Sequence, residues 1–330
     1  MREEQVIIIG AGPCGMSAAI ELQNKGFDPL IIEKGNIVNA IYHYPTHQTF
    51  FSSSEKLEIG EVPFIIEERK PKRNQALAYY RDVAKRKNLR IHSYEKVNKI
   101  ETENDGFVIE SEKLHESKEI TYRAKHVVIA TGYYDSPNYM GIPGEDLDKV
   151  MHYFKEPHPY FNKDVVVVGG KNSAVDAALE LEKAGARVTV LYRQGEYSKS
   201  IKPWILPEFE ALVRNGKVQM AFNAELVEVR EKEVVITVNG EKQTIANDFV
   251  FAMTGYHPDH SFLTKIGIDI DEASGRPAFD PETMETNVEG CYIAGVIAAG
   301  NNANEIFIEN GRHHGAQIAN DIIDKARKPI

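Results

Sequence analysis

A short loop near the start of the chain concentrates residues that could do chemistry. Gly10, Gly12 and Gly15 have the G-x-G-x-x-G spacing of loops that hold the pyrophosphate of a dinucleotide. In such loops one glycine makes the turn, one lets the pyrophosphate approach the backbone, and one lets the helix pack closely on the strand. Pro13 and Cys14 lie inside the same loop, so a thiol is expected close to bound phosphates.

The loop has the flanking elements that this motif requires. Residues 6–9 predict an apolar strand, 16–22 an alanine-rich helix and 29–32 a second strand. Glu33 ends that second strand, about twenty residues beyond the loop, where a carboxylate can accept ribose hydroxyls. An acid there repels a 2′-phosphate and favours FAD or NAD. The alternative is a glycine turn in an ordinary α/β domain, with Glu33 in solvent.

A second loop repeats this plan. Residues 164–168 predict a strand, 175–183 a helix and 187–193 another strand. Between the first strand and the helix lie the residues expected at the phosphates of a second nucleotide, which are Gly170, Lys171, Asn172, Ser173 and Ala174. Lys171 occupies the position of the middle glycine, so its side chain must be turned away from the pyrophosphate or rearranged around it.

The second copy differs at the end of its second strand. Tyr192 and Arg193 replace the acid, and Lys199 and Lys202 follow closely. Cations here suit a 2′-phosphate and hence NADPH, and the alternative is that Arg193 is a plain surface arginine. Two adjoining nucleotide domains suggest a tightly held flavin and an exchangeable nicotinamide, with hydride passing between their rings.

The repeat extends through the rest of each copy. Each glycine unit is followed by a predicted three-stranded antiparallel meander and by a buried strand that ends in Thr-Gly, at Thr131-Gly132 and Thr254-Gly255. In the first copy these strands are expected at 97–100, 107–109, 120–122 and 126–130, with a turn at 104–106. In the second they are expected at 225–229, 234–238, 243–245 and 249–252, with an Asn239-Gly240 turn.

The repeat predicts an α/β fold of two Rossmann-like dinucleotide-binding domains, each with a meander, the second inserted in the first. The expected boundaries are residues 1–138 with 257–330 for an FAD-binding domain, and 139–256 for an NADPH-binding domain. A turn and last strand at 286–295 and a long helix at 304–326 would complete the first domain. Residues 35–64 predict an irregular segment that either covers a cofactor or substrate, or packs as a helix and loop in the core.

Composition argues against several other classes of protein. The 330 residues carry a net charge of -10, without basic blocks or a long apolar run, which disfavours binding to nucleic acid or to an anionic membrane. No charged-then-apolar leader precedes the first strand, so a cytoplasmic protein is expected. With two cysteines and no Cys-x-x-Cys, neither a disulfide framework nor a thiolate zinc site is expected. The adjacent pair His313-His314 is expected on a helix surface, not as metal ligands.

Together, the paired loops and the motifs Ala130-Thr131-Gly132, Met253–Asp259 and Gly290–Gly295 resemble the thioredoxin-reductase-like flavoproteins over essentially the whole chain. The resemblance is greatest to two-domain members that lack Cys-x-x-Cys and have a cysteine in the first glycine loop. It implies an enzyme that passes hydride from NADPH through FAD to bacillithiol disulfide, a small-molecule substrate, and a homo-oligomer. It implies FAD contacts from the first loop, Glu33, Lys34, Val97, Thr131, Gly132 and the Gly295 turn, and NADPH contacts from the second loop and Arg193. Val296, Tyr192 and Lys199 are further candidate cofactor-binding residues.

Two positions depart from the family pattern. Val296 stands where the family usually has an aspartate that reaches the flavin, and the redox cysteine pair is missing. Cys14 is therefore the candidate catalytic residue, since a helix N-terminus can stabilise a thiolate that attacks a disulfide. The alternative is that Cys14 is a small residue packed in a tight turn. Cys291 is expected to be a buried strand residue.

Other functions remain compatible with the paired loops. A flavin monooxygenase or a ferredoxin-NADP reductase would share them. A non-catalytic regulator that responds to NADPH is a third possibility, for which residues 35–64 are the candidate surface.

Overall fold

The computed structural model describes residues 1–103, 105–302 and 305–327. The chain divides into two units. Unit 1 contains Met1–His43, His47–Ser136 and Tyr256–Ile330, and unit 2 contains Tyr44–Thr46 and Pro137–Gly255. Among the described residues, none of the helices combines the length and the apolar character that crossing a bilayer requires.

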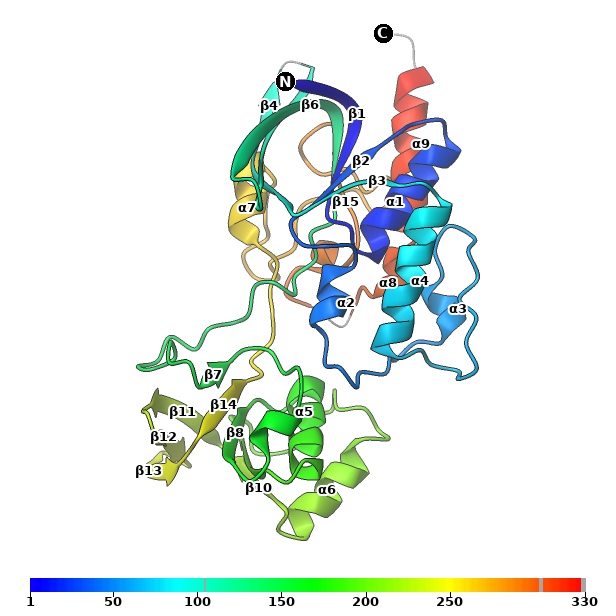
Figure 1. Cartoon of the computed structure of the whole chain (residues 1–330). Coiled ribbons are helices and arrows are strands. Elements are labelled where there is room, and N and C mark those ends of the chain that lie inside the picture. The colour runs from blue at the N-terminus through cyan, green and yellow to red at the C-terminus, as the bar shows by residue number, and fades with distance from the viewer. Residues whose placement is uncertain (104, 303–304, 328–330) are drawn as a thin grey trace. The chain divides into compact units, whose positions relative to one another are not determined.

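Unit 1 is built on a seven-stranded sheet with the order β3-β2-β1-β6-β5-β4, in which β15 also pairs with β6 (Figure 1). Its strands are β1 (Arg2–Ile9), β2 (Leu30–Glu33), β3 (Arg90–Ser93), β4 (Glu95–Glu103), β5 (Gly106–Lys113), β6 (Lys118–Ile129) and β15 (Cys291–Ile293). Its helices are α1 (Pro13–Asn24), α2 (Asn39–His43), α3 (Ser54–Leu57), α4 (Arg73–Arg86), α7 (His260–Ile266), η2 (Val296–Ala299), α8 (Ile308–Gly311) and α9 (His314–Arg327).

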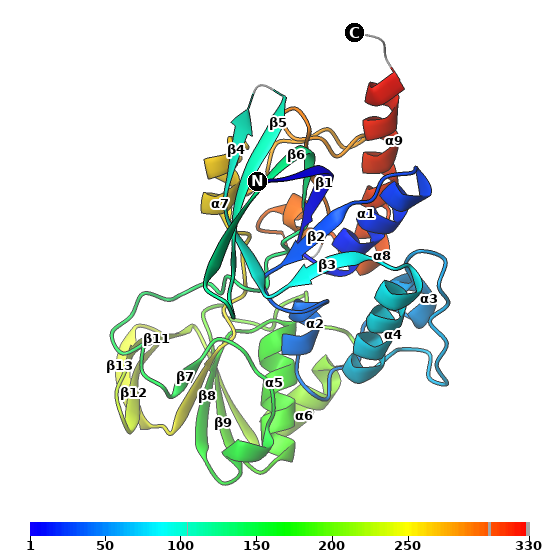
Figure 2. The same ribbon diagram turned by 45° about the horizontal axis from the view of Figure 1, so that its top comes forward.

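Helices α1 and α9 lie side by side in unit 1 (Figures 1 and 2). Gly315 allows this close approach, because a Cβ atom at that position would lie 2.6 Å from the Cα atom of Ala18. The Ser17 hydroxyl also donates to the Arg312 carbonyl at 2.7 Å. The C-terminal helix is thus fixed directly to the helix that follows the first glycine loop.

Unit 2 contains a five-stranded parallel sheet with the order β10-β9-β8-β14-β7 and a separate three-stranded antiparallel sheet, β11-β12-β13. Its elements are β7 (Val150–Met151), η1 (His158–Tyr160), β8 (Asp164–Val168), α5 (Asn172–Lys183), β9 (Arg187–Tyr192), α6 (Leu206–Arg214), β10 (Val218–Phe222), β11 (Ala224–Val229), β12 (Glu233–Val238), β13 (Glu241–Ala246) and β14 (Phe249–Ala252). Figure 2 shows the parallel sheet between the small sheet on one side and α5 and α6 on the other.

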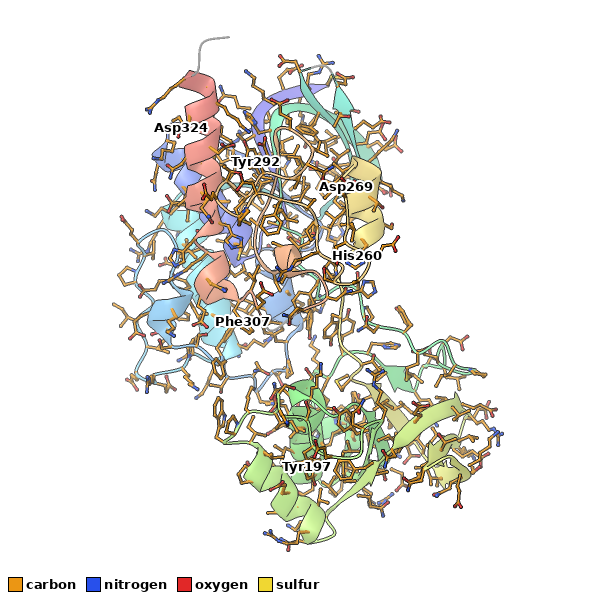
Figure 3. The ribbon with its side chains drawn as sticks, turned by 180° about the vertical axis from the view of Figure 1, so that it is seen from behind. Tyr197, His260, Asp269, Tyr292, Phe307 and Asp324 are labelled. Atoms are coloured by element: carbon orange, nitrogen blue, oxygen red, sulfur yellow. The ribbon has the colours of Figure 1, made fainter. Side chains whose placement is uncertain are left out.

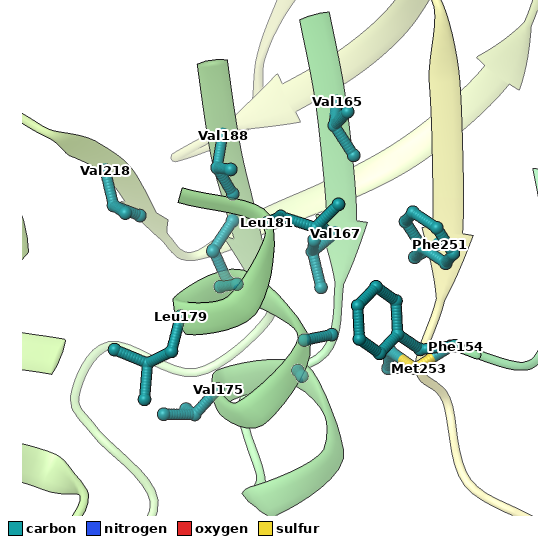
Figure 4. Close-up of a cluster of buried hydrophobic side chains, with 14 of the residues drawn as sticks. Phe154, Val165, Val167, Val175, Leu179, Leu181, Val188, Val218, Phe251 and Met253 are labelled. Atoms are coloured by element: carbon teal, nitrogen blue, oxygen red, sulfur yellow. The ribbon is translucent and has the colours of Figure 1, made fainter. Parts of the chain in front are cut away.

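Successive side chains of β8 point to opposite faces of the sheet and contribute to two hydrophobic cores in unit 2. Val165 and Val167 point toward α5 and pack with Phe251, as Figure 4 shows. Val166 points to the other face and joins the cluster that the three-stranded sheet covers. The central strand is therefore buried on both faces, which explains its continuous run of valines.

The architecture confirms the predicted fold class of two Rossmann-like units, each with a three-stranded antiparallel meander. The Asn239-Gly240 turn is also confirmed, since both residues have positive φ angles, 51° and 85°. Cys291 is fully buried in β15, as predicted.

Several element predictions are wrong in detail. Residues 120–122 and 126–130 were expected as separate strands, whereas β6 is one strand that pairs first with β5 and then with β15. The expected single helix at 304–326 is two helices, α8 and α9. Residues 35–64 contain the short helices α2 and α3, in line with the helix-and-loop alternative. Asn104 and Asn304, which belong to a predicted turn and a predicted helix, lie outside the described residues.

Candidate functional site

Four strand ends meet at one edge of the unit 1 sheet. Ile9 pairs with Ile32 and with Ile129, and Ile129 pairs with Ile293. Because these strands are parallel, the segments that leave them lie at the same edge, where open α/β sheets bind ligands. These segments are 10–15, 33–35, 130–132 and 294–296, and they contain all the predicted FAD contacts except Val97.

The three glycines of the first loop have separable roles. Gly10 has φ +108°, and a Cβ atom on it would lie 2.5 Å from the Ala130 carbonyl oxygen. A Cβ atom on Gly15 would lie 2.1 Å from the Gly10 carbonyl oxygen. Gly12 is the N-cap of α1, and a Cβ atom there would have no neighbour within 4 Å. The first and third glycines are therefore required for packing, and the second leaves open space in front of the helix N-terminus.

Glu33 is buried beside this loop. Its Oε2 atom accepts the Ala11 N–H at 2.8 Å and its Oε1 atom accepts the Gly35 N–H at 2.7 Å. Burial raises the pKa of Glu33, while the two backbone hydrogen bonds act in the opposite direction. The carboxylate is thus held in place, and each oxygen has a second lone pair that can accept a ribose hydroxyl.

The remaining predicted FAD contacts surround the same edge. Lys34 forms a 2.9 Å ion pair with Asp135, which connects the end of β2 with the segment that follows Thr131. Gly132 has φ +71° with open space around it. Val97 lies farther along the sheet, buried in β4 at a bulge in the pairing with β5.

Cys14 lies at the start of α1 with its sulfur packed between two glycines. A Cβ atom on Gly295 would lie 3.0 Å from the Cys14 Sγ atom, and a Cβ atom on Gly311 would lie 2.9 Å from it. Burial raises the pKa of the Cys14 thiol to about 12, so the thiol form predominates at neutral pH. In these surroundings the thiol fits the packing interpretation, and its use as a nucleophile requires transfer of its proton.

His314 is a residue of this site that the sequence did not reveal. The Gly295 N–H donates to His314 Nδ1 at 3.1 Å. Burial, with a smaller contribution from His313, lowers the pKa of His314 to about 4, so the ring is neutral and carries its proton on Nε2. The predicted surface position is correct for His313, which is exposed, and wrong for His314, which is half-buried at the start of α9 with its ring against Gly295. Val296, next to Gly295, begins the short helix η2.

The second loop reproduces the geometry of the first within unit 2. Gly169 has φ +138°, and a Cβ atom there would lie 2.5 Å from the Met253 carbonyl oxygen, as at Gly10 and Ala130. The N-cap of α5 is Lys171, with φ -109° and an exposed side chain. That φ angle suits any residue, so lysine replaces the middle glycine without backbone strain.

The other loop residues are partly engaged in packing. A Cβ atom on Gly170 would lie 2.2 Å from the Tyr192 ring, so the ring covers this glycine. The Asn172 amide donates to the Ser200 carbonyl at 2.9 Å and accepts the Lys202 N–H at 2.9 Å. Ser173 is exposed and Ala174 is buried.

Cations gather on the segment after β9. Arg193 and Lys199 are exposed, and within the described ranges neither forms an ion pair with a carboxylate. Lys202, by contrast, pairs with Asp176 on α5 at 3.3 Å. The Asn172 and Lys202 contacts hold this segment against the first turn of α5, a role that residue spacing alone could not indicate.

The chain is similar to known proteins over nearly its full length. It is 69% identical over 325 residues to the bacilliredoxin reductase of Bacillus subtilis (strain 168), covering 98% of both chains. A solved structure named bacillithiol disulfide reductase, from Bacillus cereus, is 66% identical with a TM-score of 0.97, covering 98% of this chain and 100% of that one. One of the same name from Staphylococcus aureus is 58% identical with a TM-score of 0.94, covering 99% and 100%. The model of a family described as pyridine nucleotide-disulphide oxidoreductase matches residues 7–295, and the chain belongs to that family.

Proposed function

We propose that this protein is an NADPH-dependent flavoprotein that reduces bacillithiol disulfide. The observation that carries the proposal is the duplicated loop geometry, with an acid at the second strand end in unit 1 and an arginine in unit 2. The names of the similar structures from Bacillus cereus and Staphylococcus aureus support the same substrate.

The residues of unit 1 fit FAD, which we assign to that unit. Gly12 leaves open space at a helix N-terminus, where N–H groups can bind a pyrophosphate. Glu33 is held by two backbone donors, and each carboxylate oxygen keeps a second lone pair for a ribose hydroxyl. When bound, FAD would supply the two electrons for disulfide reduction.

The residues of unit 2 fit NADPH, which we assign to residues 137–255. The N-terminus of α5 offers N–H groups to a pyrophosphate, and the exposed Lys171 is directed into solvent. Arg193 and Lys199 supply the positive charge that a 2′-phosphate needs.

In this proposal Cys14 is the nucleophile. Its sulfur attacks one sulfur of bacillithiol disulfide, which forms a mixed disulfide and releases one bacillithiol thiolate. The proton of Cys14 passes to that thiolate, so charge is conserved. Two electrons and one proton then release the second bacillithiol and restore the Cys14 thiolate, which a further proton neutralises. Because burial raises the pKa of Cys14, loss of its proton requires a proton acceptor.

Steady-state NADPH oxidation with bacillithiol disulfide tests the proposal. We expect turnover by the wild-type protein and a loss of at least about 100-fold in kcat for Cys14→Ala, as is usual for removal of a nucleophile. Cys291→Ala is the matched control and should keep its kcat, because Cys291 is buried in β15. Undiminished turnover by Cys14→Ala would remove Cys14 from the mechanism, and no turnover by the wild type would remove this substrate.

The name of the Bacillus subtilis relative suggests a second substrate, an oxidised bacilliredoxin. The same assay with that protein as oxidant separates the two candidates. A long-lived oxygenated flavin or rapid reduction of a one-electron carrier would instead favour a monooxygenase or a ferredoxin reductase.

We further propose a cytoplasmic location and a homo-oligomer. The location is supported by the two cysteines, which are both free thiols. Size-exclusion chromatography with light scattering measures the oligomeric state directly.

A further inference from the structure

We infer that His314 is a positioning residue for Cys14, because its Nδ1 atom holds the glycine turn against which the Cys14 sulfur lies. The inference rests on the proposed function, since it concerns how the proposed nucleophile is oriented.

The first step is the conformation of the Gly295 turn. Gly295 has φ +83° and ψ -159°, a region that side-chain-bearing residues rarely adopt. Three hydrogen bonds determine its path. Ala294 N–H donates to the Ile129 carbonyl at 2.9 Å, Ala298 N–H donates to the Gly295 carbonyl at 3.1 Å, and Gly295 N–H donates to His314. The histidine bond is the one made by a side chain, so it is the one that a substitution can remove.

The second step is the contact between this turn and the sulfur. Cβ atoms on Gly295 and Gly311 would lie 3.0 and 2.9 Å from the Cys14 Sγ atom, closer than a methyl group normally approaches, and a Cβ atom on Gly311 would also lie 3.2 Å from the Gly295 Cα atom. The three residues therefore meet at one point. A shift of the Gly295 backbone would change the space in which the sulfur can rotate.

The third step is the support behind His314. Helix α9 begins at His314 and is packed on α1 through Gly315, and the carbonyl of Arg312 accepts the Ser17 hydroxyl. Cys14 is on that same helix α1. The contacts form a closed ring that runs from Cys14 along α1, across to α9, through His314 to Gly295, and back to Cys14. Without the imidazole acceptor, the buried N–H of Gly295 would lack a hydrogen-bond partner. Because glycine has few backbone restrictions, the turn could then rotate until this N–H reaches another acceptor.

Three variants of the flavin-loaded protein and one control test the inference. His314→Asn keeps an acceptor near the position of Nδ1, His314→Leu removes it, and His314→Gln moves it one bond farther from the backbone. His313→Leu is the matched control, since His313 is the adjacent histidine and is exposed.

The readouts are kcat and KM for bacillithiol disulfide, the rate of Cys14 alkylation by iodoacetamide, and the visible absorption spectrum of the flavin. We expect His314→Leu and His314→Gln to lower kcat by about 10-fold or more with KM changed less than about 3-fold, and to alkylate several-fold faster. His314→Asn and His313→Leu should remain close to the wild type in all three.

Unchanged kcat and alkylation in His314→Leu would overturn the inference, and so would equal losses in the Asn and Leu variants, because the acceptor would then be irrelevant. If the Leu variant does not fold, the Gln variant decides between the same outcomes. If Cys14→Ala proves fully active, the proposed nucleophile fails, whereas the alkylation rates still decide whether His314 positions the sulfur.

Discussion

His126 and His314 are two histidines whose charge the fold suppresses. Burial is the main cause in both, and it lowers the pKa of each to about 4. Each ring is therefore neutral near pH 7 and, in the folded protein, stays neutral well below the pH at which a free histidine takes up a proton. At His314 this keeps Nδ1 available as the acceptor for Gly295.

The suppressed charge predicts a pH-dependent stability. Between about pH 6.5 and 4, the unfolded chain binds a proton at His314 that the folded chain does not, so the free energy of unfolding falls as pH falls through this range. The total contribution of His314 to the free energy of unfolding is of order 3 kcal/mol. Urea unfolding at several pH values should show a smaller decrease in the free energy of unfolding at acid pH for His314→Asn than for the wild type. Parallel curves for the two proteins would contradict the prediction.

The C-terminal helix is tied to β15 by a cluster of charged and aromatic residues. The Tyr292 hydroxyl donates to Asp321 at 2.7 Å, and Lys325 pairs with Asp321 at 2.9 Å and also with Glu285. Figure 3 labels Tyr292 beside the helix that carries Asp324. These contacts fix the far end of α9, while Gly315 fixes its beginning on α1.

The crossing of α1 and α9 predicts the effect of a small substitution. Gly315→Ala would gain about 1 kcal/mol in helix propensity, but its methyl group would lie 2.6 Å from a backbone atom that no rotamer change can move. Overpacking of this kind destabilises by about 1–3 kcal/mol, so we expect a net loss of stability. Urea unfolding followed by flavin fluorescence measures it. Asn320→Ala, on the exposed side of α9, is the control and should not destabilise.

The elements that the sequence predicts well are those with a strong local signal. Glycine spacing, the valine run of β8 and the Asn239-Gly240 turn depend on neighbouring residues alone. Helix α6 and strand β10 are absent from the sequence prediction, although both are rich in apolar residues. The role of His314 also escapes prediction, since its partner Gly295 lies nineteen residues away and is brought close only by the packing of α9.

The two units share one loop geometry. Gly10 and Gly169 pack in the same way against the strand that returns beside them, at Ala130 and Met253. The difference lies at the strand ends, where Glu33 is buried and Arg193 is exposed. In the proposed function, nucleotide preference is therefore set by one position in each unit and not by the loop itself.

This arrangement predicts the cofactor preference of the whole enzyme. Arg193→Ala removes a charge-assisted bond to a 2′-phosphate, worth about 1.5–3 kcal/mol, and should lower kcat/KM for NADPH by about 10- to 100-fold. The value for NADH, which lacks that phosphate, should change little. Lys217→Ala is the control, because it removes a cation of unit 2 that lies outside the segment after β9 and pairs with Glu182. Equal losses with both nucleotides would show that Arg193 does not contact the 2′-phosphate.

The order of the chain has a consequence for its synthesis. Strand β6 leaves the ribosome before residues 137–255, and its partner β15 leaves after them. The inserted unit is almost contiguous, so it can fold while its host still lacks β15 and the helices α7, η2, α8 and α9. Once folded, it joins its own ends, since Asn138 N–H donates to the Gly255 carbonyl at 2.9 Å. The long segment between β6 and β15 then behaves as a short loop. This reduces the conformational entropy that the chain loses when β15 pairs with β6.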